Sequence, residues 1–265
     1  MGSFMDLQLQ NKNALVCGST QGIGKATAIL LAKEGANVTL ISRNEEKLKS
    51  VLAELSNRNQ NHNYIVADFS DPNEVQQNVA DFISKNQGFH ILVNNTGGPA
   101  GGPIFDAKID EFEAAFTQHL KCNHLLVQTL VPFMKNECYG RIVNVISTSV
   151  KQPLDGLGVS NTIRGAVASW SKTMANELGE FGITVNNVLP GATGTERLNE
   201  IIKNKSAKTG KSIDQISQNM QNASPAKRFA KPEEIANAIV FLTSEKASYI
   251  NGINVPVDGG RTKSL

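Results

Sequence analysis

Cysteine is scarce in this sequence. The 265 residues include only three cysteines, at positions 17, 122 and 138, and they lie far apart. Their odd number and wide spacing exclude a disulfide framework and the paired ligand spacing of a zinc site. We therefore expect a protein of a reducing compartment, the cytoplasm, with no bound metal.

Long apolar runs and an excess of one charge are also absent. No run approaches the length that crosses a membrane, and the N-terminal residues lack the basic-then-apolar pattern of a signal peptide. The 26 Lys and Arg residues against 24 Asp and Glu residues leave a net charge of +2. This balance argues against nucleic acid and acidic surfaces as partners.

Strand-like and helix-like segments alternate along the whole chain, without an internal repeat or a domain linker. This alternation predicts a single α/β domain over residues 1–265, a Rossmann-like, doubly wound parallel sheet with helices on both faces. Seven strands are expected, over residues 14–17, 37–41, 63–67, 90–93, 141–146, 184–189 and 253–257.

Local signals place the helix ends. Asn44 can cap a helix that runs through Leu55, and Gly35 can end the helix before it. The run from Asp71 to Glu74 combines an N-cap, a proline at the first helical position and a capping-box glutamate. Further helices are expected from Asp110 towards Lys135, from about Ser160 to Phe181, and from position 231.

Residues 196–224 are rich in Asn, Gln, Lys and Ser and poor in aromatic residues. We interpret them as a mobile helical insert. It would serve either as a lid over a binding site or as a solvated surface excursion.

A glycine-rich turn follows the first strand. Strand, glycine turn and helix form the geometry that holds a dinucleotide pyrophosphate, because glycines allow close backbone approach and the first helical N–H groups face the phosphates. The spacing is Gly-x-x-x-Gly-x-Gly, so the turn could also be purely structural. The residues expected to contact the nucleotide here are Gly18, Ser19, Thr20, Gly22, Ile23 and Gly24.

The residue after the second strand distinguishes the two nicotinamide cofactors. An acidic residue there binds the ribose 2′-OH of NAD, whereas an arginine accommodates the 2′-phosphate of NADP. This strand ends in Ser42 and Arg43, which favours NADP (NADPH) over NAD. Asp68, after the third strand, could accept a hydrogen bond from the adenine amino group or could stabilise a turn.

Several motifs together resemble the short-chain dehydrogenase/reductase family, particularly its 3-oxoacyl-carrier-protein-reductase-like branch. Cys17 stands where that family usually has Thr, and Thr96 replaces Ala in its Asn-Asn-Ala-Gly motif. The resemblance covers nearly the whole chain. It rests on the glycine turn, on 94–97 (Asn-Asn-Thr-Gly), 140–144, 190–195, 231–236 and 257–260. It implies further cofactor contacts from Asn95, Gly97, Arg164, Pro190, Gly191 and Thr195.

The same resemblance implies an altered catalytic centre. The family uses an Asn, a Ser and a Tyr-x-x-x-Lys pair. Alignment on the fifth strand puts Ser147 at the family serine, Ser160 at the tyrosine position and Arg164 at the lysine position. The family asparagine falls on His119. Only one of these four positions keeps its family residue.

These replacements change the proton chemistry that is available. A phenol can be tuned towards neutrality by a nearby cation, whereas a serine hydroxyl is a poor general acid, and arginine stays protonated. Candidate donors are His119, whose ordinary pKa lies near the working range, or a water held by Ser147 and Ser160. Lys151 and Asp155 are weaker candidates. Alternatively, His119 is a satisfied structural histidine and Ser160 a plain helix N-cap.

Two functions follow from the sequence. The first is an NADP(H)-dependent oxidoreductase that reduces a small carbonyl compound or oxidises an alcohol with a non-standard proton donor. The second is a nucleotide-binding sensor or scaffold without redox turnover.

The halohydrin dehalogenases of this fold also carry an Arg at the Lys position, but they keep the Tyr and lose the glycine turn. The resemblance also implies a homotetramer, with helices 110–135 and 161–181 at an interface.

Overall fold

One parallel sheet organises the part of the chain that the structure describes, residues 6–264 of a computed structural model. Its strands are β1 (Asn13–Cys17), β2 (Asn37–Ser42), β3 (Asn63–Val66), β4 (Ile91–Asn94), β5 (Gly140–Val145), β6 (Ile183–Pro190) and β7 (Asn254–Val257). They lie in the order β3-β2-β1-β4-β5-β6-β7, and every neighbouring pair is parallel. The predicted fold class is confirmed, with strand ends shifted by one residue at most places.

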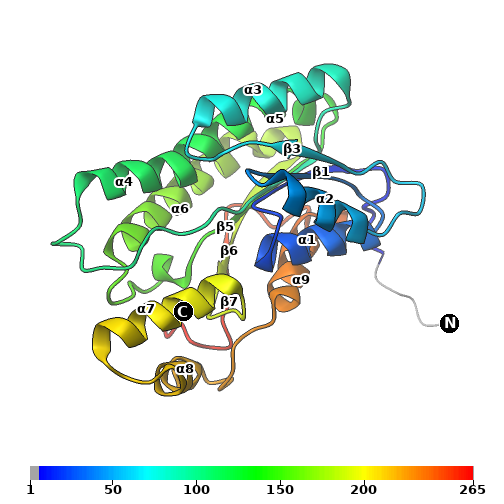
Figure 1. Ribbon diagram of the computed structural model, residues 1–265. Coiled ribbons are helices and arrows are strands. Elements are labelled where there is room, and N and C mark those ends of the chain that lie inside the picture. The colour runs from blue at the N-terminus through cyan, green and yellow to red at the C-terminus, as the bar shows by residue number, and fades with distance from the viewer. Residues whose placement is uncertain (1–5, 265) are drawn as a thin grey trace.

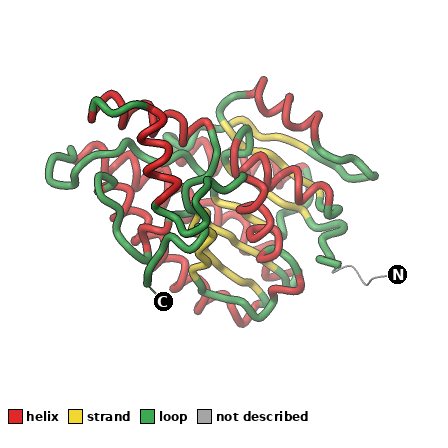
Figure 2. The backbone as a smooth tube through the Cα atoms, turned by 90° about the horizontal axis from the view of Figure 1, so that it is seen from below, coloured by secondary structure: helices red, strands yellow, loops and turns green. Residues whose placement is uncertain are grey.

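Helices cover both faces of this sheet (Figures 1 and 2). They are α1 (Gly22–Lys33), α2 (Glu45–Glu54), α3 (Pro72–Lys85), α4 (Ile109–Phe116), α5 (Cys122–Asn136), α6 (Gly158–Leu178), α7 (Glu196–Thr209), α8 (Ile213–Asn222) and α9 (Pro232–Leu242). One apolar core joins the sheet to α1, α2 and α9. A second joins it to α3, α5 and α6. Because both faces are buried, the central strands are apolar almost throughout.

Residues 196–224 are helical, as predicted, and form α7 and α8. Both helices stand apart from the sheet at the bottom of Figure 1. They pack on each other through a small apolar cluster of their own that includes Leu198, Ile202 and Ile216.

Three helix predictions need correction. The helix expected from Asp110 to Lys135 starts at Ile109 and contains a π-helical turn, Thr117–Lys121, between α4 and α5. The helix expected at Ser160 starts at Gly158, so Ser160 lies in its first turn and is not the N-cap. Asp71 caps α3 as predicted. Glu74, however, accepts a hydrogen bond from the Asp68 backbone rather than completing a capping box.

A row of buried amides crosses the sheet. The register places Asn94 beside Asn144, Asn144 beside Asn187 and Asn187 beside Asn254. Their side chains hydrogen-bond from strand to strand at 2.8, 3.1 and 2.8 Å. Ser171 of α6 joins the row through Asn144 and Asn187. The row thus ties four strands to α6 directly below the loops of the carboxyl edge.

All three cysteines are free thiols, and they differ in accessibility. Cys17 and Cys122 are buried, whereas Cys138 is exposed. Cys138 also has a φ of +50°, in the left-handed region that favours glycine. It sits two residues before β5, at the amino end of that strand.

No helix within residues 6–264 combines the length and the apolar character that a membrane crossing requires.

Candidate functional site

The glycine turn is built for close backbone approach. Gly18 has a φ of +57°, and a Cβ there would lie 2.3 Å from the Asn95 carbonyl oxygen. A Cβ on Gly24 would lie 2.3 Å from the Gly18 carbonyl oxygen. The Asn95 amide donates to the carbonyls of Cys17 and Gly18, both at 3.3 Å. No side chain larger than glycine fits either position, so the turn keeps its shape.

The first turn of α1 retains open hydrogen-bonding capacity. Its N-cap, Gln21, makes no side-chain cap, and the first turn carries no acidic residue. The Ser19 hydroxyl is buried without a partner among the described residues. An anionic group is the expected partner for such a helix start. These groups fit a nucleotide pyrophosphate.

A groove of about 450 Å³ runs beside this turn, between the starts of α1, α7 and α9. Gly22 and Thr195 face each other across it, and a Cβ on Gly22 would lie 3.0 Å from the Thr195 methyl. The loop 190–195, which the sequence predicts at the nicotinamide, therefore touches the glycine turn. Thr195 also caps α7 by accepting from the Leu198 N–H.

Arg43 and Asp68 meet at the end of β2. The Arg43 side chain is 78% exposed and lies 3.9 Å from one Asp68 oxygen. The other Asp68 oxygen accepts from the Ser70 N–H at 2.9 Å, and this bond lowers the pKa of the carboxyl group. One oxygen of Asp68 thus stabilises the turn to Ser70. Ser42 ends β2 beside this pair.

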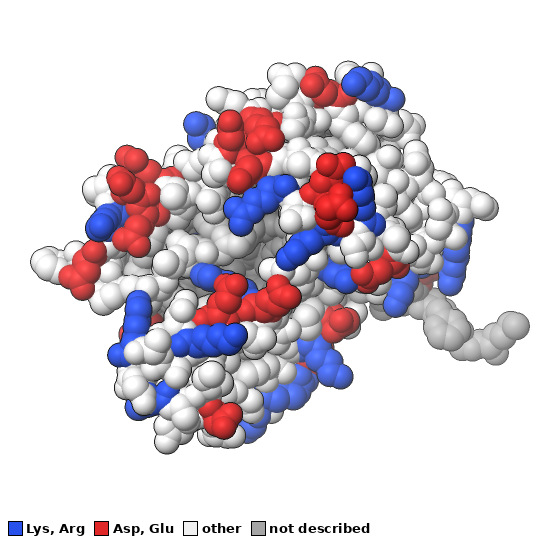
Figure 3. Space-filling view, in the orientation of Figure 1, with Lys and Arg blue, Asp and Glu red and all other residues white. Residues whose placement is uncertain are grey.

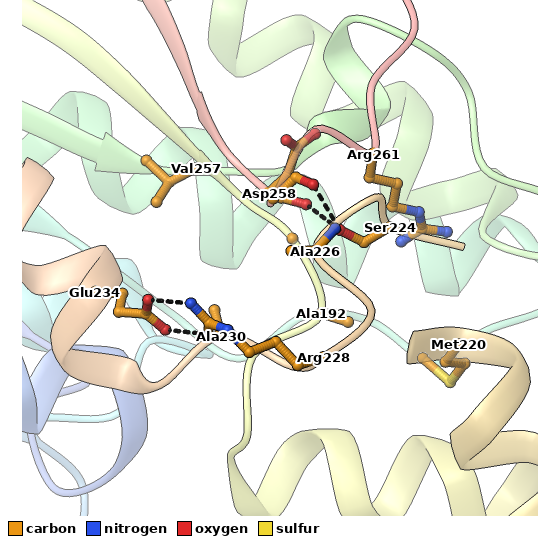
Figure 4. A pocket seen from close by; sticks show the side chains of 12 residues that line it. Ala192, Met220, Ser224, Ala226, Arg228, Ala230, Glu234, Val257, Asp258 and Arg261 are labelled. Carbon is orange, nitrogen blue, oxygen red and sulfur yellow. Dashed lines mark hydrogen bonds and ion pairs between the residues drawn. The ribbon is translucent and has the colours of Figure 1, made fainter. Parts of the chain in front are cut away.

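A smaller cavity lies behind the loop 190–195 (Figure 4). Its volume of about 90 Å³ is enough for roughly three waters. Arg228 and Glu234 close one side through two hydrogen bonds of 2.6 Å. On the other side, Ser224 donates to the carbonyl oxygens of Asp258 and Gly259. The cavity is too small for a substrate, so we assign it a structural role.

Arg164 and His119 form a buried cluster at the carboxyl ends of β4 and β5. Arg164 of α6 is 7% exposed and donates to the Val145 carbonyl oxygen at 3.0 Å. His119, in the π-helical turn, is 1% exposed. Its Nδ1 lies 2.5 Å from the Thr96 hydroxyl, and its Nε2 is buried without a partner among the described residues. Three sequence-distant segments therefore converge here.

The electrostatics of this cluster argue against one of the two candidate roles of His119, that of a titrating proton donor. Burial, reinforced by the charge of Arg164, lowers the pKa of His119 to about 2. Its pKa is therefore far from the working range that its ordinary value suggested. The imidazole is neutral at physiological pH and can act only as a hydrogen-bonding group. Burial also lowers the pKa of Arg164 to about 10, which still leaves it charged at neutral pH.

The two predicted site serines are half-buried and come from different elements. Ser147 follows β5, and its hydroxyl accepts from the Ser149 N–H at 3.1 Å. Ser160 lies one helical turn before Arg164 on α6, so both side chains share a helix face. Within residues 6–264, no hydrogen bond joins the Ser160 hydroxyl to His119 or Arg164.

The insert helix α7 contacts the glycine-rich loop above this cluster. Arg197 donates to the carbonyl oxygens of Gly98 and Pro99 at 3.1 and 2.9 Å. Lys208 donates to the Gly101 carbonyl at 3.4 Å. In the space-filling view, charged side chains of both signs surround a hollow in the middle of this face (Figure 3).

Sequence reasoning missed the roles of Thr96 and Arg197. One signal was present: Thr96 is the single change in the Asn-Asn-Ala-Gly motif, and His119 is a change from the family asparagine. The two substitutions hydrogen-bond to each other. No local pattern marks Arg197, because its carbonyl partners lie almost 100 residues earlier in the chain.

Known proteins share this architecture. The family described as enoyl-(acyl carrier protein) reductase matches residues 18–262. The NADPH-dependent reductase BacG of Bacillus subtilis is 29% identical over 259 residues, which cover 97% of this chain and all of BacG. The 3-oxoacyl-[acyl-carrier-protein] reductase FabG of Thermotoga maritima is 32% identical over 256 residues, 96% of this chain and 99% of FabG.

Solved structures of known enzymes have the same fold. L-sorbose reductase from Gluconobacter frateurii, complexed with NADPH and L-sorbose, superposes with a TM-score of 0.92. It is 32% identical, and the match covers 98% of this chain and 100% of the reductase. With the fold and nearly the whole length in common, this chain belongs to the short-chain dehydrogenase/reductase family.

Proposed function

We propose that this protein is an NADPH-dependent oxidoreductase that reduces a small carbonyl compound, or oxidises the corresponding alcohol, without a tyrosine proton donor. The observation that carries the proposal is the glycine turn, where Gly18 and Gly24 leave no room for a side chain and α1 begins uncapped. The names of BacG and of the L-sorbose reductase structure support NADPH as the cofactor.

Cofactor contacts are assigned along the carboxyl edge of the sheet. The glycine turn would hold the pyrophosphate, and Ser42 with Arg43 would face the adenosine 2′-phosphate. Asn95, Gly97 and the loop from Pro190 to Thr195 would line the nicotinamide end. Arg164 would donate to the ribose hydroxyls. Bound NADPH supplies the hydride, and orientation by these residues accounts for a large part of any rate.

The chain's own contribution to proton transfer would come from hydrogen bonds rather than from a titrating acid. Ser147 and Ser160 are proposed to orient the carbonyl oxygen and to hold the water that supplies the proton. Neutral His119 would offer a hydrogen-bonding group beside the substrate, and charged Arg164 would keep the site positive. The low pKa of His119 argues against a histidine general acid.

One observation favours the second candidate, a nucleotide-binding protein without turnover. Burial moves the pKa of His119 to about 2, away from neutrality, and Arg164, with a pKa of about 10, stays charged at neutral pH. Both candidates require NADPH binding, so binding alone does not separate them.

A substrate screen that follows NADPH absorbance separates the two. The panel should contain ketones, aldehydes and ketoses, together with α,β-unsaturated carbonyl compounds, because the matching family is described as an enoyl reductase. Turnover that drops in Ser147→Ala and His119→Ala supports the enzyme and its site. If turnover is unchanged in both variants, Ser147 and His119 are not part of the catalytic site. Tight NADPH binding without turnover on any compound supports the second candidate.

A double substitution tests the assignment of the two replaced positions. Ser160→Tyr combined with Arg164→Lys restores the family pair. We expect carbonyl reduction to rise if the remaining pocket is competent. Unchanged activity in a folded, NADPH-binding double variant would mean that the pocket has diverged beyond these two positions.

The oligomeric state is also a proposal. Apolar side chains stand exposed on and before α4, with Phe105 96% exposed and Ile109 and Phe116 also in solvent. Such a patch is typical of a protein–protein contact. We propose that it is covered in a homotetramer, as the family resemblance implies, and that the protein works in the reducing cytoplasm.

A further inference from the structure

The two buried arginines of the described chain differ in their partners. Arg141, 2% exposed, lies 3.4 Å from the Glu245 carboxylate and donates to three backbone carbonyls. Among residues 6–264, Arg164 has no carboxylate within ion-pair distance, and its one hydrogen bond goes to the Val145 carbonyl. A buried charge without a counter-ion is costly, so proteins normally pair it. The missing partner of Arg164 therefore points to a ligand.

The surroundings of Arg164 offer a stretch of loop without side chains and a second polar group. A Cβ on Gly98 would meet only Arg164 Nη2, at 3.8 Å, and a Cβ on Gly97 would meet nothing within 4 Å. Gly98 thus presents backbone, and no side chain, to the guanidinium. His119 Nε2 is buried without a partner in the same cluster. In the tautomer where Nδ1 accepts from Thr96, this Nε2 carries a hydrogen and donates.

The cofactor phosphates do not fill this role. They are expected at the start of α1, which follows β1, whereas Arg164 is anchored at the end of β5. In the sheet β1 and β5 are separated by β4, so the two positions lie roughly 10 Å apart across the strands. Ribose hydroxyls would accept hydrogen bonds from Arg164 but bring no charge.

We propose that Arg164, assisted by His119, binds the carboxylate of an anionic substrate. A guanidinium offers two parallel N–H groups that match the two oxygens of a carboxylate. This inference rests on the proposed function and narrows its substrate to small carbonyl or hydroxy compounds that also carry a carboxylate group.

Calorimetry on the NADP⁺-saturated protein tests the site without turnover. The probes are malonate, its neutral isostere malonamide, and inorganic phosphate. We expect saturable binding of malonate and none of malonamide. Arg164→Gln should weaken malonate binding at least tenfold, because a charge-assisted pair is lost, and Arg164→Lys should weaken it less. Arg58→Gln, which removes an exposed arginine elsewhere, should bind as wild type does.

Three results would overturn the inference: equal binding of malonate and malonamide, malonate binding unchanged in Arg164→Gln, or binding of phosphate without malonate. If Arg164→Gln no longer binds NADP⁺, the wild-type comparison of malonate with malonamide decides. Failure of the proposed function looks different, since the wild-type protein would then bind NADPH and turn over no compound of the substrate screen. Reduction of neutral ketones at the rate of matched keto acids would reject the inference and leave the function standing.

Discussion

At the scale of single residues, we propose that Arg43 selects NADPH over NADH. It is exposed, and its only described ionic neighbour is Asp68 at 3.9 Å. Because that contact is long and solvated, it contributes little, and the guanidinium is available for a phosphate.

Arg43→Ala should weaken NADPH binding by roughly ten- to a hundredfold, since one or two charge-assisted hydrogen bonds are lost. NADH binding should change much less. Fluorescence titration with both nucleotides measures this, with Arg58→Ala as a control for loss of an exposed arginine. An equal loss of affinity for NADH and NADPH would mean that Arg43 does not bind the 2′-phosphate.

His119 gives the fold a pH-dependent stability. Its folded pKa of about 2 lies below the ordinary value of 6.5, so below pH 6.5 the unfolded chain binds a proton that the folded chain does not. The free energy of unfolding should therefore fall as the pH drops below 6.5, by up to about 1.4 kcal/mol per unit.

Urea unfolding at pH 7.5 and pH 5 measures this effect. His119→Asn, which still offers polar groups to Thr96, should lose about 2 kcal/mol less than wild type between these conditions. The buried His90, whose pKa burial also lowers, is present in both proteins, so the difference isolates His119. Identical pH profiles would show that the imidazole is not held neutral.

At the scale of elements, the sequence predicts the strands and most helices because their signals are local. Asp71 and Asn44 cap helices where short-range patterns place them. The π-helical turn at Thr117–Lys121 escapes such patterns, since it is a single i→i+5 turn that interrupts an otherwise α-helical spacing only once. The Thr96–His119 bond and the neutral state of His119 depend on burial by distant segments, which one sequence does not display.

The amide row stabilises the sheet and α6 together. Asn144→Leu would leave Asn94, Ser171 and Asn187 without one partner each. We expect a loss of about 2–5 kcal/mol in the free energy of unfolding, since buried unsatisfied groups cost about 1–3 kcal/mol each and partly re-pair. Thr184→Val is the matched control: its hydroxyl is buried and unpartnered, so its removal should be neutral or stabilising. Equal losses of unfolding free energy in the two variants would show that the amide row does not stabilise the fold more than an unpaired buried hydroxyl does.

The contact of α7 with the glycine-rich loop can be tested in the same way. Arg197→Ala removes the bonds to Gly98 and Pro99, and Lys205→Ala removes an exposed charge from the same helix. Hydrogen exchange of residues 97–102 and 196–209 should accelerate in the first variant alone. Unchanged exchange would show that these bonds do not hold the insert.

At the scale of the whole molecule, we expect the exposed apolar side chains of α4 to contact another subunit. Phe116→Asp places a charge in the proposed contact and should shift a tetramer to smaller species. Sedimentation velocity measures the shift, with Lys121→Asp as a charge control on the neighbouring turn. A wild-type protein that sediments as a monomer would remove the tetramer proposal.

The exposed thiol at the amino end of β5 has a practical consequence. Of the three cysteines, Cys138 alone is open to solvent, and six residues of β5 place it roughly 20 Å from the carboxyl edge. A maleimide fluorophore would therefore attach at one defined point, remote from the nucleotide. That single label would report rotational diffusion, and hence assembly, without any engineered cysteine.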